Sequence, residues 1–306
     1  MQTILGSTGI IGRLTAMELV KYTDKIRLVS RNPKKVNSGD ELVNAVLTDI
    51  SQVRNAVNGS EIVYVTAGLK YNTKVWEAQW PLIIKNVISA CMENKSKLVF
   101  FDNVYALGLV KGRMGEDTPL NPVSKKGQVR KIINELIMDE VEKGNLDALI
   151  IRSADFYGHD TLSFVNAMIF DRMIKGKKPQ WLVNDKLKHS FTYTPDAAKA
   201  TALLGNTPSA YNQAWHAPSD RNALTGKEFI ELCCDAAGYP KGYSVISKSM
   251  LKLIGIFNSF IKESIEMLYQ NEYEYLFDSS KIEKAFNFKP TTYLNGITET
   301  FKLLKN

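Results

Sequence analysis

The chain has 306 residues, of which 44% are hydrophobic and 23% charged, and its formal net charge is +7. This length and composition are typical of a globular protein with two domains, or one domain and an added lobe, that buries its core without disulfides. The lysines and arginines are scattered, so the basic excess does not favour a nucleic-acid or membrane partner. Part of this excess positive charge would suit a binding site for phosphate-bearing small molecules.

The cysteine and histidine patterns exclude two further classes. Two of the three cysteines are adjacent, Cys233 and Cys234, which does not fit a secreted disulfide scaffold. The three histidines are far apart and show no metal-ligand spacing. No apolar run reaches the ~20 residues that span a bilayer, and we expect a cytoplasmic protein.

The first half of the chain alternates between β-rich runs and helical segments. The predicted strands cover residues 2–6, 26–30, 41–49, 60–68, 97–103 and 147–158. Helical patterns between them cover residues 13–22, 51–57, 75–94 and 125–145. Asp49 is expected to cap the second helix. Six apolar strands joined by helices predict an α/β fold, a Rossmann-type doubly wound parallel sheet.

The alternation weakens after residue 158, which predicts a smaller C-terminal substrate lobe. We expect the dinucleotide-binding domain to span residues 1–158, with 187–203 returning to it, and the lobe to contain 159–186 and 204–306. Asp196 is a candidate N-cap, and a helix over 226–238 should end at its glycine. Residues 249–261 place an apolar stripe on one face, for which core packing or a lid over a pocket is favoured over a membrane surface.

A glycine-rich loop directly follows the first strand and precedes the first helix. Gly6, Gly9 and Gly12 form the pattern G-x-x-G-x-x-G. Gly6 allows a tight turn, Gly9 lets a pyrophosphate approach the backbone, and Gly12 lets the helix pack close to the strand. Backbone amides at the helix start then hold the phosphates. The expected contacts also include Thr8, Ile10 and Ile11.

The end of the second strand indicates which dinucleotide binds. A preference for NAD would place Asp or Glu near Ser30 and Arg31, and neither is present. Arg31 offers a forked set of donors that suits a 2′-phosphate, and Ser30, Lys34 and Lys35 can add to it. The sequence therefore favours NADP over NAD.

Several segments in order resemble the extended short-chain dehydrogenase/reductase family, which includes nucleotide-sugar epimerases and dehydratases. They are ILGSTGIIG (4–12), TAG (66–68), GEDTPLNP (115–122), IRSADFYG (151–158), TPDAAKA (194–200) and FDSSKIEKAFNFKP (277–290). The resemblance implies the fold, a pyridine dinucleotide near Ala67 and Gly68, and a small-molecule substrate. Homodimers through the two long helices, which here follow the fourth and fifth predicted strands, are usual for similar folds.

The catalytic positions of the family are changed. The family's Tyr-x-x-x-Lys matches Lys126 and Arg130, and its Ser-Ser or Thr-Ser strand end matches Asp102 and Asn103. Four residues apart on a helix, Lys126 and Arg130 share a face, which the resemblance places against the nicotinamide ribose. Arg130 is expected to hold the ribose. Lys126, beside Arg130 and the cationic ring of an oxidised nicotinamide, would have a lowered pKa and serve as acid or base. Alternatively, it only holds cofactor or substrate oxygens or points to solvent.

Other residues complete the candidate site. Tyr105 is a second candidate proton donor, or a pocket-lining residue, and Asn103 can hydrogen-bond a substrate carbonyl. Substrate-side candidates are Tyr71, Phe156, Tyr157 and His189.

Two functions follow from these patterns. One is an NADP-dependent oxidoreductase or epimerase-like enzyme that acts at a carbonyl or carbinol carbon of a small molecule, with sugar nucleotides among the substrates the resemblance implies. The alternative is a non-catalytic NADP-binding regulator, which the missing tyrosine favours. The substrate lobe and the GEDTPLNP segment favour the enzyme.

Overall fold

The computed structural model describes residues 1–305 and contains one seven-stranded sheet in which every neighbouring pair is parallel. Its strand order is β12-β7-β5-β4-β1-β2-β3. These strands are β1 (Gln2–Leu5), β2 (Ile26–Ser30), β3 (Glu41–Asn44), β4 (Ile62–Val65), β5 (Lys97–Asn103), β7 (Ala148–Ser153) and β12 (Gln213–His216). The predicted doubly wound α/β fold is therefore confirmed.

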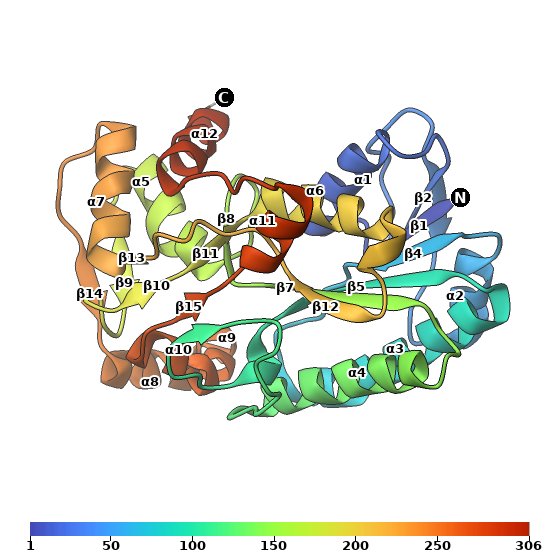
Figure 1. The fold of residues 1–306 in the computed structure, drawn as a ribbon. Coiled ribbons are helices and arrows are strands. Elements are labelled where there is room, and N and C mark those ends of the chain that lie inside the picture. Colours follow the sequence, from blue (N-terminus) through green and yellow to red (C-terminus); the bar gives the residue numbers. More distant parts are fainter. Residues whose placement is uncertain (306) are drawn as a thin grey trace.

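Helices cover both faces of the sheet (Figure 1). One face carries α1 (Ile10–Leu19) and α6 (Thr194–Gly205), which pack against each other. The other carries α2 (Ile50–Val57), α3 (Thr73–Asn94) and α4 (Lys125–Glu142). The central strands are apolar on both sides because helices bury both faces, and β1, β4 and β7 are buried along their whole length.

The seventh strand was not expected from the sequence. β12 pairs in parallel with β7, although its residues lie in the segment that we assigned to the substrate lobe. Its four residues follow a short 3-10 turn, η3 (Pro208–Ala210), and are too few to give a clear strand pattern. The sheet thus takes residues 213–216 from the expected lobe.

Capping explains where several helices begin and end. Asp49 accepts hydrogen bonds from the backbone of Ser51 and Gln52 at the start of α2, as predicted. Gly238 ends α7 in the left-handed conformation, also as predicted. The expectation for Asp196 is wrong: α6 begins at Thr194, before Pro195 in its first turn, and the Asp196 carboxylate instead accepts from Thr291.

The rest of the chain forms a C-terminal lobe of short elements, on the left of Figure 1. Its strands are β8 (Asp155–Tyr157), β9 (Gln180–Leu182), β10 (Lys188–His189), β11 (Phe191–Tyr193), β13 (Leu224–Thr225) and β14 (Ser244–Ile246). Its helices are η2 (Asn166–Phe170), α5 (Asp171–Ile174), α7 (Gly226–Ala237), α8 (Lys248–Phe257), α9 (Ser259–Ser264), η4 (Ile265–Met267), α10 (Tyr269–Glu272) and α12 (Tyr293–Lys305). The remaining elements are η1 (Tyr105–Leu107), β6 (Arg113–Met114), β15 (Leu276–Phe277) and α11 (Ser280–Phe286).

The apolar stripe of residues 249–261 does not pack into a core. Met250, Leu253 and Phe257 are exposed, and α8 buries only Leu251 and Gly255. The expectation of core packing is therefore wrong, because the buried side of α8 is narrower than its apolar side. Within residues 1–305, no helix is both long and apolar enough to cross a membrane.

Candidate functional site

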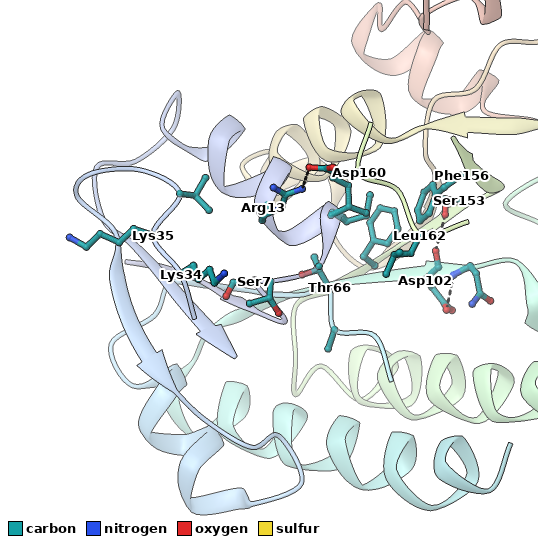
Figure 2. Close-up of a pocket in the computed structure, with 18 of the residues that line it drawn as sticks. Ser7, Arg13, Lys34, Lys35, Thr66, Asp102, Ser153, Phe156, Asp160 and Leu162 are labelled. Carbon is teal, nitrogen blue, oxygen red and sulfur yellow. Dashed lines mark hydrogen bonds and ion pairs between the residues drawn. The ribbon is translucent and has the colours of Figure 1, made fainter. Parts of the chain in front are cut away.

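A crevice of about 830 Å³ opens where the central strands end. The turns that follow β1 and β4 meet there with the last residues of β5 and β7, and the strand order reverses between β1 and β4. Ligands of doubly wound folds bind at such a switch point. The lining residues are Ser7, Thr8, Gly9, Ile10, Ile11, Arg13, Lys34, Lys35, Val36, Thr66, Ala67, Phe101, Asp102, Asn103, Arg130, Ser153, Phe156, Asp160 and Leu162. Figure 2 shows Lys34 and Lys35 at one end and Asp102, Ser153 and Phe156 at the other.

The glycine loop forms the middle of the crevice through unusually close backbone contacts. Gly6 has a φ of +96°, and a Cβ there would lie 2.4 Å from the backbone of Ala67. A Cβ at Gly12 would lie 2.7 Å from the Gly6 carbonyl oxygen and 2.8 Å from Thr66 Oγ1. Only glycine fits at either position, so the turn lies tightly against the end of β4.

The start of α1 is suited to an anion. Gly9 is its N-cap and has no side chain to occupy the first-turn amides, and a Cβ there would meet only ordinary contacts. The hydroxyl of Ser7 is buried and makes no hydrogen bond to any described residue. Free amides, the helix dipole and an unused hydroxyl together fit a pyrophosphate.

The cations at the β2 end differ in part from those expected. Lys34 and Lys35 line the crevice, whereas Ser30 and Arg31 do not. Arg31 is exposed, and its carbonyl accepts a hydrogen bond from Asn44. The chain bends at Arg31 and Asn32, and the two lysines that follow Pro33 line the crevice.

A buried polar network lies at the opposite end. The Asp102 carboxylate accepts hydrogen bonds from the backbone N–H of Asn103 and from Asn134 Nδ2, and its Oδ1 lies 3.4 Å from Arg130 Nε. Arg152 donates to Asn134 at 2.8 Å. Burial lowers the pKa of Arg130, and the charge of Asp102 opposes that shift. Asp102 thus supports the loop and the arginine.

Arg130 lines the crevice from α4, the helix that also carries Lys126. Its guanidinium lies over the rings of Trp76 and Trp80, with centroids at 4.7 and 4.2 Å. Its Nη1 is buried and makes no hydrogen bond within residues 1–305, whereas its Nε faces the Asp102 carboxylate in an ion pair. A packed guanidinium with unused donors is prepared to hold ligand oxygens.

Lys126 does not reach the crevice. Its side chain is 0% exposed, and Nζ lies 2.9 Å from Glu263 Oε2 and 2.8 Å from Glu266 Oε1. It also donates to Thr73 Oγ1 and the Glu263 carbonyl. Lys126 was expected to face the cofactor, but it is not among the residues that line the crevice, because carboxylates from α9 and η4, far away in sequence, engage its long side chain.

The ion pair with Lys126 also changes the pKa of Glu263. Burial tends to raise the pKa of Glu263, but hydrogen bonds from Lys126 and Thr73 outweigh it and lower that pKa to about 2. The same contacts tie the start of α4 to the C-terminal lobe, since Glu266 also accepts from the Lys125 N–H at 2.8 Å.

Tyr105 lies just behind the crevice-lining Asn103. Asn103 Oδ1 accepts a hydrogen bond from the Tyr105 N–H at 3.0 Å. The Tyr105 ring stacks on Trp76, and burial raises the pKa of Tyr105 well above its usual value. Tyr71 is close enough to add to that shift, and its ring also contacts the Lys126 ammonium. Tyr105 therefore stays protonated and neutral near the crevice.

Phe156 and Tyr157, two of the other substrate-side candidates, lie in different surroundings. Phe156 lines the crevice and stacks on Phe101. Tyr157 does not: it is 1% exposed and packs against Phe170 and Phe229 in the lobe core. In a strand, successive side chains point to opposite sides, so only one of the pair can face the crevice.

His189 also lies outside the crevice lining. Its Nε2 is 3.0 Å from Asp155 Oδ2, and its ring stacks between Phe191 and Tyr275. Gly68 is likewise not among the lining residues, whereas Thr8, Ile10, Ile11 and Ala67 are.

Sequence reasoning missed a contact across the crevice. Arg13 in α1 lies 3.2 Å from Asp160 in the loop after β8, as Figure 2 shows. Both side chains are nearly half exposed, and such pairs contribute at most about 1 kcal/mol. Leu162 follows at the rim. No local motif marks these residues, because their role depends on the fold of distant segments.

The model of the NAD-dependent epimerase/dehydratase family matches residues 3–215. The chain therefore belongs to this family, which confirms the resemblance to extended short-chain dehydrogenases/reductases. A search of curated proteins gave no significant match.

Solved structures share the fold over nearly the whole chain. UDP-N-acetylglucosamine 4-epimerase from Bacillus cereus is 17% identical, with a TM-score of 0.78 and coverage of 100% of this chain and 99% of that one. UDP-glucose 4-epimerase from Thermotoga maritima, with UDP-glucose, is 15% identical, with a TM-score of 0.82 and coverage of 99% and 98%. The dTDP-glucose 4,6-dehydratase from Bacillus anthracis, in complex with NAD, is 13% identical, with a TM-score of 0.81 and coverage of 99% and 96%.

The glycine contacts give a paired prediction. Gly12→Ala is expected to lower the free energy of unfolding by about 1–3 kcal/mol, because its Cβ overlaps backbone. Gly9→Ala should change stability by less than about 1 kcal/mol but weaken dinucleotide binding roughly tenfold or more, since the methyl group obstructs the phosphate. Urea unfolding and calorimetric titration measure the two effects. Equal stability of the two variants would contradict the close packing of Gly12 against Gly6 and Thr66.

The buried lysine predicts a pH-dependent stability. Because the pKa of Glu263 is depressed in the folded state, its contribution is complete above its ordinary pKa of 4.5 and is lost as the pH falls toward about 2. Lys126→Met should destabilise the protein by roughly 2–4 kcal/mol near neutral pH, and by progressively less below about pH 4.5. Urea unfolding across this pH range tests this. Lys131→Met, on the outer face of the same helix, is the control, and a pH-independent difference for Lys126→Met would contradict the ion pair.

Proposed function

We propose that the chain is an NADP-dependent enzyme that interconverts a carbonyl and a carbinol carbon of a small molecule. The observation that carries this proposal is one continuous crevice with lysines at one end, a glycine cradle in the middle, and Arg130 and Asn103 at the other. Family membership and NAD complexes of solved structures with the same fold support a pyridine dinucleotide. Sugar nucleotides are the first substrates to test, since the solved epimerases and dehydratases of this fold act on them.

The residues of the crevice fit the parts of the dinucleotide. The α1 amides and the Ser7 hydroxyl would hold the pyrophosphate, because both are free of other partners. Lys34 and Lys35, with Arg31 outside them, would hold the 2′-phosphate, since no carboxylate ends β2 to accept from a ribose hydroxyl. The unused donors of Arg130 would hold the second ribose. When bound, the nicotinamide would supply or accept the hydride.

The protein then has to orient an oxygen and move a proton. Asn103 lines the crevice and can donate its amide N–H groups to a substrate oxygen while its Oδ1 holds the Tyr105 backbone. Tyr105 is the proton donor that we favour over Lys126, since it follows Asn103 in the same loop and its backbone is held by the Asn103 side chain. Lys126 is engaged by two carboxylates instead.

A second function has one specific observation in its favour. The position of the family's catalytic tyrosine holds a lysine that is used in structural ion pairs. A regulator that binds NADP without chemistry would tolerate that change. Tight NADPH binding without turnover on a broad panel of carbonyl compounds and sugar nucleotides would establish this alternative.

Dinucleotide choice gives one test of the proposal. Lys34→Ala/Lys35→Ala should weaken NADPH binding about tenfold or more and leave NADH binding within about twofold, because only NADPH carries the 2′-phosphate. Arg31→Ala should have a smaller effect, since Arg31 is exposed outside the lining. Isothermal titration calorimetry measures both affinities, with Lys302→Ala on α12 as the control. Tighter binding of NADH than NADPH by the unaltered protein would refute the NADP assignment.

The proton donor gives another test. Tyr105→Phe should reduce kcat about 100-fold or more while NADPH affinity stays unchanged, because only the hydroxyl is removed. Lys126→Met should lower stability without a comparable loss of kcat in the folded fraction. Stopped-flow or steady-state oxidation of NADPH with an active substrate measures this. An unchanged kcat in Tyr105→Phe rules out Tyr105.

A further inference from the structure

Six large apolar side chains are exposed together on α8 and the start of α9. We refer to them as the α8–α9 face. Its members are Met250, Leu253, Ile254, Ile256, Phe257 and Phe260. Phe257 is 88% exposed and Ile256 71%. Such a concentration within eleven residues marks an interaction surface, because exposed hydrophobic side chains of ordinary surfaces occur singly.

The attachment of α8 explains why these side chains face outward. The helix is fixed to the lobe along one narrow edge, where Leu251 packs with Leu182, Ile246 and Leu268. Gly255 continues that edge, since a Cβ there would lie 3.1 Å from Ile265. The other apolar side chains of the helix, Met250, Leu253, Ile254, Ile256 and Phe257, are exposed, and Figure 1 shows α8 at the margin of the lobe.

The charges within the segment that carries the face have one sign. Residues 248–262 contain three lysines and no acidic residue. Lys248 pairs with Glu272, whereas Lys252 and Lys262 form no ion pair within residues 1–305. An apolar face bordered by lysines complements an anionic lipid surface. It complements a second copy of itself poorly, because the same lysines would oppose each other.

The crevice does not account for this face. No residue of α8 or α9 is among those that line the crevice, so the lid that the sequence allowed is not formed over it. Only Phe260 turns inward in part, with its ring 5.5 Å from that of Tyr71. The α8–α9 face therefore has a role separate from dinucleotide binding.

We propose that the α8–α9 face docks the protein on an anionic membrane surface. Ile256 and Phe257 enter the headgroup region, and Lys252 and Lys262 contact the lipid phosphates. This is peripheral binding by an interfacial helix, which needs no membrane-spanning segment.

Vesicle co-sedimentation of the full-length protein tests the proposal. The probes are phosphatidylcholine vesicles and vesicles of equal parts phosphatidylcholine and phosphatidylglycerol. We expect binding to the anionic vesicles, weaker binding at high salt, and loss of binding in Ile256→Ser/Phe257→Ser. Lys252→Gln/Lys262→Gln should weaken binding about 30-fold, from about 1 kcal/mol for each lysine. Met17→Ser/Val20→Ser, which removes two apolar side chains that are about half exposed at the end of α1, should bind as the unaltered protein does.

Each other outcome overturns the proposal. Absence of binding to anionic vesicles does so directly, as does equal binding of the Ile256→Ser/Phe257→Ser variant. Equal binding to both vesicle types would exclude recognition of an anionic surface. A dimer in light-scattering measurements that Ile256→Ser/Phe257→Ser dissociates, without vesicle binding, would assign the face to a second copy. Thermal unfolding confirms that every variant is folded, and NADPH titration shows separately whether the crevice is intact.

Discussion

The close approach of the β1–α1 turn to the end of β4 is the constraint on which the candidate site depends. Gly6 and Gly12 leave no room for a side chain, so the helix start and the β4 turn lie against each other with backbone in contact. This contact stands where the strand order reverses, and it places the free amides of α1 in the centre of the crevice. Lys34 follows β2, and Arg130 on α4 contacts Asp102 at the end of β5, so the two lie at opposite ends because β2 and β5 flank β1 and β4.

Charge burial explains how the family's catalytic helix keeps its place after its residues have changed. Lys126, fully buried, would be costly without partners, and Glu263 and Glu266 provide two carboxylates. Arg130, one turn later, is balanced by Asp102 and by aromatic faces. The two cations that share a helix face therefore have different functions: one fastens α4 to the lobe and the other presents donors to the crevice.

Local patterns predicted the parts of the molecule that are close in sequence. The six strands, the glycine turn and the caps at Asp49 and Gly238 follow from periodicity and from residues a few positions apart. The positions of Lys126 and Tyr157 could not be predicted this way. Lys126 is placed by carboxylates 137 and 140 residues away, and Tyr157 by an aromatic core assembled from five separate segments.

The same distant contacts connect the surface of the lobe to the inferred chemistry. Phe260 belongs to the exposed α8–α9 face and packs on Tyr71, which in turn influences Tyr105. Three residues further on, Glu263 holds Lys126 and Thr73, at the starts of α4 and α3. Phe260 and Glu263 both lie in α9, so this short helix contacts the exposed surface on one side and Tyr71 and Lys126 on the other. The lysine in place of a catalytic tyrosine is thus the point where the lobe and the dinucleotide fold are joined.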